Sequence, residues 1–220
     1  FGQERLWFLA QLEPESPAYH IPVAVRLEGK LEIGALEQAF RWLVDRHEPL
    51  RTVFATQAGQ PVQVIGPVSS IKLAVEPAAS GSRAELTRFF REPFDLAQGP
   101  LLRVKVVRLG AEDYLLALVL HHIVTDGWSS GILVRELPQL YRAALAGKEN
   151  PLPPLGIQYA DYAVWQRAWL TAGELKRQVE YWRAELADAP PLLDLPTDFP
   201  RPTSLSHRGS RVSLELGAEL

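Results

Sequence analysis

Cysteine and methionine are both absent from the 220-residue sequence. The lack of cysteine excludes disulfides, thiolate catalysis and cysteine-based metal sites. Because methionine is missing even at position 1, we expect the sequence to be a piece of a longer chain. The sequence also lacks an uninterrupted apolar run near the roughly 20 residues that cross a bilayer, and a recognisable signal peptide. We therefore expect no membrane partner and a cytoplasmic location.

The sequence also has no excess of positive charge. The net charge is -3, which argues against a nucleic-acid partner. Neither a P-loop nor a G-x-G-x-x-G stretch is present, so no nucleotide or flavin cofactor is indicated. The sequence is 47% hydrophobic and 22% charged, which is ordinary for a folded protein. Its length suits one domain, or one domain and the start of another.

Apolar periodicity predicts helices and strands along the whole chain. The predicted helices are 1–12, 32–47, 82–92, 128–146, 157–170 and 173–187. The predicted strands are 21–29, 51–54, 61–65, 71–76, 101–109, 114–122 and 208–216. In the second helix one face carries Leu36, Ala39, Phe40 and Leu43. The adjacent strands 101–109 and 114–122 should form an antiparallel hairpin, the second strand being more buried because its apolar run is nearly unbroken.

A pair of histidines lies where a predicted strand meets a predicted helix, in the stretch LVLHHIVTDGWSS (118–130). Neighbouring side chains of a strand point to opposite faces, so we expect one of His121 and His122 to be buried and the other to project outward. Gly127 permits a positive φ and a close approach of the backbone to a ligand. A histidine near its ordinary pKa of about 6.5 can take or hold a proton near neutral pH.

Several kinds of chemistry fit these residues. One is acyl transfer, in which a histidine acts as base or as hydrogen-bond partner of an attacking amine or hydroxyl. A metal site made of His and Asp lacks a third and a fourth ligand in the sequence. Ser-His-Asp hydrolysis lacks the G-x-S-x-G elbow. The structural alternative is a pair of satisfied core histidines beside a helix-capping Asp126.

A second concentration of charge, Arg46, His47 and Arg51, lies where a predicted helix turns into a strand. Pairing of the arginines with nearby carboxylates would support the fold. A direct catalytic role for His47 is the alternative.

The stretch HHIVTDGWS (121–129) resembles the HHxxxDG signature of condensation domains of non-ribosomal peptide synthetases, in the chloramphenicol-acetyltransferase-like superfamily. Further stretches are similar to other motifs of this family, in the same order: GQERLWFL (2–9), RHEPLRTVF (46–54), YADYAVWQ (159–166) and LPTDFPRP (195–202). Trp128-Ser129 resembles the condensation form rather than the epimerization form, and the histidine pair differs from the acidic residues of heterocyclization domains. The stretches AYHIP (18–22) and RLWFLAQLEP (5–14) resemble the sub-type that joins two L-residues.

The resemblance implies an α/β fold, a two-layer sandwich with a mixed, largely antiparallel sheet that forms one lobe of two. Residues 1–187 would be the N-terminal lobe, 188–208 a proline-rich connector, and 209–220 the start of the C-terminal lobe. A reaction channel would lie between the lobes. Because one lobe cannot form it, we expect this piece alone to fold poorly or partly and not to catalyse condensation.

The resemblance also implies an activity. The amine of an acceptor aminoacyl thioester would attack a donor acyl or peptidyl thioester, both on phosphopantetheine arms of upstream and downstream carrier domains, with an adenylation domain adjacent. His122 would be catalytic, as base or as positioner, and the backbone of Gly127 would lie near the reaction centre. Structural roles are implied for His121, Asp126 (held by a salt bridge), Trp128, Ser129, Arg46 and Arg51. No directly bound cofactor and no metal is implied, and the alternatives are an epimerization domain and a non-catalytic carrier-docking relative.

Overall fold

The structure is a computed structural model that describes two units of the chain, Phe1–Glu174 and Leu175–Leu220. The described residues are 1–68, 71–193, 195–200, Thr203, Val212, Leu214, Glu215 and Gly217. The second unit contains the helix α6 (Leu175–Glu185). Most of the predicted strand 208–216 lies outside the described residues, as does part of the connector expected at 188–208.

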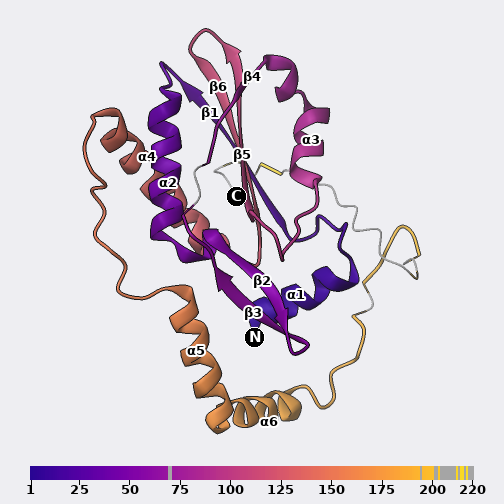
Figure 1. Cartoon of the computed structure of the whole chain (residues 1–220). Coiled ribbons are helices and arrows are strands. Elements are labelled where there is room, and N and C mark those ends of the chain that lie inside the picture. The colour runs from indigo at the N-terminus through magenta and orange to yellow at the C-terminus, as the bar shows by residue number, and fades with distance from the viewer. Residues whose placement is uncertain are drawn as a thin grey trace. The chain divides into compact units, whose positions relative to one another are not determined.

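The first unit is built around a four-stranded sheet of order β1-β6-β5-β4 (Figure 1). Its strands are β1 (His20–Glu28), β4 (Val75–Glu76), β5 (Leu102–Gly110) and β6 (Asp113–His121). The neighbours β1, β6 and β5 run antiparallel, and β4 runs parallel to β5. A separate antiparallel hairpin consists of β2 (Thr52–Gln57) and β3 (Gln60–Ile65). The predicted α/β class with a mixed, largely antiparallel sheet is therefore confirmed.

Strand β6 is the centre of the sheet, paired with β1 on one side and with β5 on the other. The predicted β5–β6 hairpin is confirmed, and β6 is the more buried strand of the two. Along it, Leu116 and Leu120 contribute to the main core, whereas Val119 and His121 alternate with them and point to the opposite face.

Strand β1 is an outer strand of the sheet and contains a proline, Pro22. Proline cannot donate a ladder hydrogen bond, so an edge is where a sheet tolerates it. The guanidinium of Arg26 on β1 donates two hydrogen bonds, each 2.8 Å, to the carboxylate of Asp113 on β6. This exposed pair lies at the end of the sheet away from the histidines.

Helices cover both faces of the sheet. The helices of the first unit are α1 (Gly2–Leu12), α2 (Ile33–Arg46), α3 (Arg83–Arg91), α4 (Gly127–Leu145) and α5 (Tyr159–Trp169), with short turns η1 (Glu48–Arg51), η2 (Ala78–Gly81) and η3 (Leu170–Glu174). The helices α2 and α4 lie side by side over one face, and α3 lies beside the other (Figure 1). Within the described ranges no helix is both long and apolar enough to span a bilayer.

The main core joins α2 and α4 to the sheet. All four apolar residues predicted to share a face of α2 are buried, which confirms that face: Leu36, Ala39, Phe40 and Leu43. They pack in one cluster with Val106 of β5, Leu116 of β6 and Leu140 of α4. Burial of these side chains holds α4, and hence the segment before it, against the end of β6.

The predicted strand 71–76 is wrong for its first four residues, since only Val75 and Glu76 form β4. The backbone N–H of Leu73 donates to the carboxylate of Glu37 on α2, at 2.8 Å, instead of to a neighbouring strand. A side-chain acceptor on another element thus ends the ladder early, which no alternation pattern in the segment itself could indicate.

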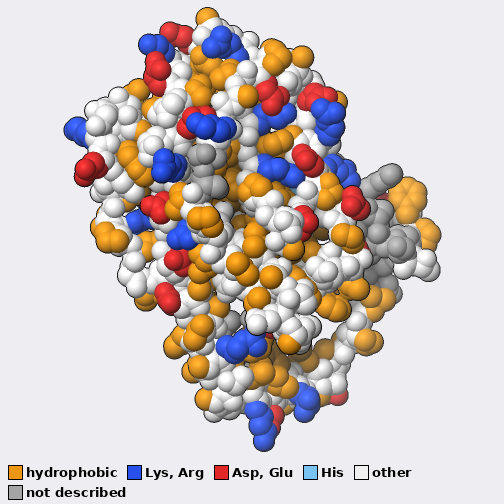
Figure 2. All heavy atoms as spheres, viewed as in Figure 1, with side chains coloured by type: hydrophobic (Ala, Val, Ile, Leu, Met, Phe, Trp, Pro, Cys, Tyr) orange, Lys and Arg blue, Asp and Glu red, His pale blue; other side chains and the backbone are white. Residues whose placement is uncertain are grey.

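Surface charges of both signs are intermixed on the face of α2, α3 and the strands shown in Figure 2. Exposed ion pairs of the first unit include Arg26–Asp113, Lys30–Glu32 and Arg88–Glu85. Solvent screens pairs of this kind, so the fold depends on its core rather than on them.

Replacing Phe40 by alanine should lower the free energy of unfolding by about 3–5 kcal/mol, because the substitution leaves a cavity among the helices and the sheet. The matched control is Phe8→Ala on α1, where the side chain is 55% exposed. It should change the free energy of unfolding by less than about 1 kcal/mol. Urea unfolding followed by circular dichroism measures both. Equal effects of the two substitutions would contradict the core described above.

Candidate functional site

The two histidines separate at the end of β6, as strand alternation predicts. His121 is the last residue of the strand and is 4% exposed, whereas the following His122 is exposed. The backbone N–H of His121 donates to the carbonyl of Leu101 at 3.1 Å, and that of His122 donates to the carbonyl of Tyr19 at 2.8 Å. The chain is thus hydrogen-bonded to both flanking segments at the point where the side chains diverge.

His121 lies in a mostly apolar setting. Its Nδ1 accepts a hydrogen bond from the backbone N–H of Ile123 at 3.1 Å, so in the neutral ring the proton is on Nε2. The rings of His20 and Phe94 lie 6.1 and 6.0 Å away. Burial, with smaller contributions from His20 and His122, lowers the pKa of His121 to about 4. His121 is therefore neutral at physiological pH and turned away from the exposed side of the motif.

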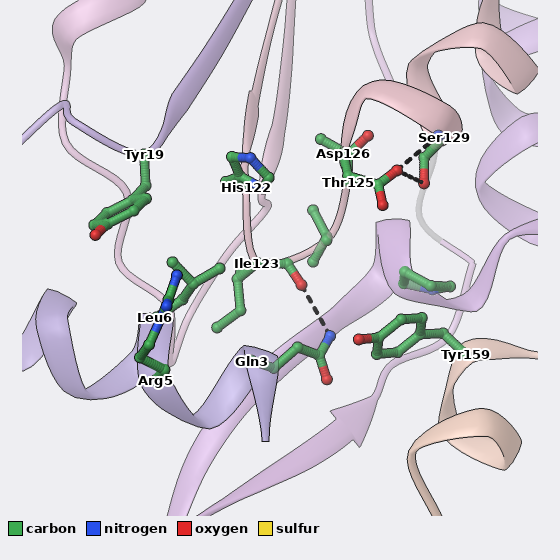
Figure 3. A pocket seen from close by; sticks show the side chains of 13 residues that line it. Gln3, Arg5, Leu6, Tyr19, His122, Ile123, Thr125, Asp126, Ser129 and Tyr159 are labelled. Atoms are coloured by element: carbon green, nitrogen blue, oxygen red, sulfur yellow. Dashed lines mark hydrogen bonds between the residues drawn. The ribbon is translucent and has the colours of Figure 1, made fainter. Parts of the chain in front are cut away.

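A cavity of about 290 Å³ opens beside His122 (Figure 3). Its walls come from distant parts of the sequence: the start of α1, Tyr19, Pro49, residues 122–126 with Ser129, and Tyr159. Four of the stretches that resemble family motifs meet here, namely 2–9, 46–54, 121–129 and 159–166. The fifth, 195–202, belongs to the second unit.

Asp126 is the N-cap of α4. Its Oδ1 accepts hydrogen bonds from the backbone N–H of Ser129 at 2.8 Å and from the Ser129 hydroxyl at 2.7 Å. These bonds lower the pKa of the Asp126 carboxyl, and the nearby His122 lowers it by a smaller amount. The carboxyl therefore stays ionised at neutral pH. The expected salt bridge is not found: within the described ranges Asp126 is held by Ser129, because the free N–H groups of a helix start bind a carboxylate without any cation.

Gly127 is the first residue of α4 and does not adopt the positive φ that glycine permits. A Cβ built on it would have open space around it. Trp128 follows on the same turn and is 83% exposed. The proximity of Gly127 to a reaction centre stays a prediction.

Arg46 and His47 share one buried carboxylate. Nε of Arg46 lies 3.2 Å from both oxygens of Glu136 on α4, and Nε2 of His47 lies 2.6 Å from Oε2. The side chains of Arg46 and Glu136 are only 10% and 11% exposed. Arg46 also donates to the carbonyl of Pro153. This cluster, which we call the Glu136 cluster, joins the end of α2 to α4 and to the segment that leads into α5.

Arg51 connects η1 to the end of β3. Its Nη1 donates to the carbonyl of Gly66 at 2.7 Å, and its Nη2 lies 3.5 Å from Oε1 of Glu48. Neither Arg51 nor Arg46 lines the cavity beside His122.

Sequence reasoning did not single out two residues that line this cavity, Gln3 and Tyr159, or Gln158, which precedes Tyr159. Gln3 donates from Nε2 to the carbonyl of Ile123 at 2.9 Å, which fixes the start of α1 to the histidine segment (Figure 3). Gln158 donates to the carbonyl of Arg46 at 2.9 Å and forms a capping box with Asp161. Gln158 and Asp161 have the three-residue spacing of a capping box but not its usual residue types, so the sequence pattern does not indicate this helix start.

Metal ligands do not gather at this site. In the part of the chain that the structure describes, no three side chains of His, Cys, Asp or Glu are grouped so as to hold a metal ion. The polar groups that line the cavity include the exposed imidazole of His122, the carboxylate of Asp126, the guanidinium of Arg5 and the phenols of Tyr19 and Tyr159.

Comparison with known proteins identifies the same family as the motif resemblance does. The chain matches the family model described as "Condensation domain" over residues 1–220. It is 47% identical over 226 residues to malpinin synthetase of Mortierella alpina, covering 100% of this chain and 3% of that protein. It is 43% identical over 225 residues to enniatin synthetase of Fusarium oxysporum, covering 100% of this chain and 7% of that protein. The chain thus spans a small fraction of the length of these relatives.

A solved structure has a similar fold. The X-domain in the complex of the X-domain and OxyB from teicoplanin biosynthesis aligns with a TM-score of 0.83 and 33% sequence identity. The alignment covers 91% of this chain and 45% of that chain, so this chain spans about half of the length of the matching structure.

The low pKa of His121 should make stability depend on pH. From about pH 6.5 down to about pH 4 the unfolded chain binds a proton on this ring and the folded chain does not, so stability falls as the pH falls. We expect a loss of about 1 kcal/mol between about pH 7.5 and 5.5 from this residue alone. Urea unfolding at both pH values measures it, and His121→Gln should show the smaller change. An identical pH dependence in the variant would contradict the assignment.

The Glu136 cluster should be sensitive to loss of its carboxylate. Glu136→Gln leaves the buried guanidinium of Arg46 without its counter-charge, and we expect a loss of about 3 kcal/mol in unfolding free energy. Lys30→Ala, which breaks the exposed pair with Glu32, is the control and should leave the unfolding free energy nearly unchanged, because solvent screens this pair. Thermal and urea unfolding of the two variants compare them directly, and a cost of Glu136→Gln as small as that of Lys30→Ala would show that the cluster is not important for stability.

Proposed function

Because this chain belongs to the condensation-domain family, we propose that it contributes the catalytic histidine for amide-bond formation between two thioesters. The donor is an acyl or peptidyl thioester and the acceptor an aminoacyl thioester. Both are carried on phosphopantetheine arms of carrier domains upstream and downstream, with an adenylation domain in the same polypeptide. The observation that carries the proposal is the exposed His122 of an intact HHxxxDG motif at a cavity where four family motifs meet.

In this reaction His122 acts on the amine of the acceptor. The nitrogen lone pair forms the C–N bond to the thioester carbonyl carbon, and the C–S bond then breaks. His122 takes or positions the proton that the amine loses, and this proton ends on the departing thiolate to give a free thiol. A histidine suits this step because it can accept and release a proton near neutral pH.

The neighbouring residues have supporting roles in this proposal. His121, neutral and buried, holds the end of β6, and Asp126 with Ser129 fixes the start of α4. Gly127 contributes its backbone near the reaction centre, and Trp128 lies beside it. Arg46 and Arg51 support the fold behind the cavity.

The lobe division is also part of the proposal. Residues 1–187 form the N-terminal lobe, 188–208 the connector and 209–220 the start of the C-terminal lobe. Support comes from the alignment with a solved chain of about twice this length. The first compact unit ends at Glu174, before the proposed boundary. We expect no condensation from residues 1–220 alone, since the second wall of the channel is supplied by the other lobe.

A non-catalytic docking role is the second candidate. It is favoured by the similarity to the X-domain, whose structure is a complex with OxyB. The intact histidine pair favours catalysis, and Trp128-Ser129 favours condensation over epimerization. The joining of two L-residues, and a cytoplasmic location, remain predictions from the sequence.

Loss of His122 should abolish peptide formation. In the full-length polypeptide with donor and acceptor carriers loaded, we expect His122→Ala to lower the single-turnover rate by about 100-fold or more. Mass spectrometry of the acceptor carrier follows the product. Val134→Ala, at a position of α4 that is 66% exposed, should leave the rate unchanged. A His122→Ala rate within about threefold of wild type would remove His122 from the mechanism, and inversion of a bound aminoacyl thioester without amide formation would favour the epimerization alternative.

A further inference from the structure

Tyr159 presents a phenol to the same cavity as His122. It is the first residue of α5 and is 39% exposed. Figure 3 shows its ring reaching into the cavity from α5, with the hydroxyl leading, while His122 enters from the end of β6. Among the described residues this hydroxyl has no hydrogen-bond partner. A hydroxyl at a half-enclosed site with no protein partner is available to a ligand.

Tyr162, one turn further along α5, has the opposite arrangement. It is 41% exposed, nearly the same as Tyr159, and the two rings lie 5.6 Å apart. Its hydroxyl accepts a hydrogen bond from Nε2 of Gln166 at 2.9 Å, and it does not line the cavity. The free hydroxyl at position 159 is therefore not a general property of tyrosines on this helix.

Two polar side chains that line the same cavity are already hydrogen-bonded within the protein. The amide of Gln3 donates to the carbonyl of Ile123, and Oδ1 of Asp126 accepts from Ser129. Burial, Tyr162 and the negative charge of Asp126 all raise the pKa of the Tyr159 phenol, so it stays protonated at neutral pH. Tyr159 is thus a hydrogen-bond donor that faces the cavity and needs an acceptor.

The position of this donor is fixed by contacts outside the cavity. Gln158 binds the carbonyl of Arg46 and accepts from the backbone N–H of Glu48 at 3.3 Å. Its own N–H donates to Asp161 at 2.9 Å, which closes the first turn of α5. A donor held in place before the substrate arrives can stabilise developing charge without reorganisation.

We propose that Tyr159 is a further catalytic residue, whose hydroxyl donates a hydrogen bond to the carbonyl oxygen of the donor thioester. The inference rests on the amide-forming function proposed above. As the C–N bond forms, the electron pair of the C=O π bond moves onto this oxygen, and the Tyr159 hydroxyl stabilises the charge. The pair returns when the C–S bond breaks, so Tyr159 keeps its proton throughout, and the proton handled at His122 ends on the thiolate.

Tyr159→Phe tests this, because it removes one oxygen and keeps the ring. In the full-length polypeptide with both carriers loaded, we expect a 10- to 100-fold lower single-turnover rate of amide formation. Tyr162→Phe is the matched control, on the same helix at nearly the same exposure, and should keep the wild-type rate. Circular dichroism melts check that both variants remain folded.

A second measurement separates this inference from the proposed function. The probe is an N-acyl amide analogue of the donor, in which a stable amide on pantetheine replaces the thioester, and calorimetry measures its affinity. We expect about 5- to 10-fold weaker binding to Tyr159→Phe and unchanged binding to Tyr162→Phe.

The outcomes then differ. If wild type forms amide, His122→Ala does not, and Tyr159→Phe matches wild type in both assays, the inference is overturned and the proposed function stands. If wild type forms no amide, the proposed function fails. In that case weaker analogue binding confined to Tyr159→Phe still supports a ligand-binding hydroxyl, and equal binding, or none, overturns it.

Discussion

The register of β6 is the constraint on which the site depends. This strand is hydrogen-bonded to β1 along one edge and to β5 along the other. A slip of one residue would exchange the directions of His121 and His122 and would also turn the buried leucines of the strand away from α2 and α4. The imidazole at the cavity is therefore fixed by the same pairing that builds the core. Two adjacent histidines can have different properties because one lies on each side of that pairing.

The Glu136 cluster connects the elements behind the cavity to one another. Its buried carboxylate joins α2 to α4, and the carbonyl of Arg46 in turn receives the amide of Gln158 at the start of α5. The phenol of Tyr159 is placed by groups that never touch the cavity. Through these contacts the stretch that contains Arg46 and His47 is connected to the start of α5, and so to one wall of the cavity.

Local pattern was enough to predict most helices and strands, the apolar face of α2 and the divergence of the two histidines, because each depends on neighbours in the sequence. It was not enough for Glu136, a carboxylate on the apolar side of α4, since its partners on α2 lie 89 and 90 residues away. The same applies to Leu73, whose backbone is held by Glu37, and to Tyr159, whose exposure to the cavity depends on where α5 begins. The predicted salt bridge of Asp126 stays a prediction: among the described residues its carboxylate accepts hydrogen bonds from the backbone and the hydroxyl of Ser129. Apolar periodicity within a segment carries no information about contacts between residues that are far apart in the sequence.

The order of the strands has a consequence during synthesis. Arg26 on β1 and Asp113 on β6 pair across 87 residues, so at about 5–20 residues per second β1 leaves the ribosome roughly 4–17 seconds before its partner. Until then β1 offers unpaired N–H and C=O groups to any other nascent strand. Pro22 removes one of those donors and Arg26 adds charge, two devices that discourage wrong pairing at a sheet edge. The residues that mark β1 as an outer strand of the finished sheet thus also protect it while the rest of the sheet is still being made.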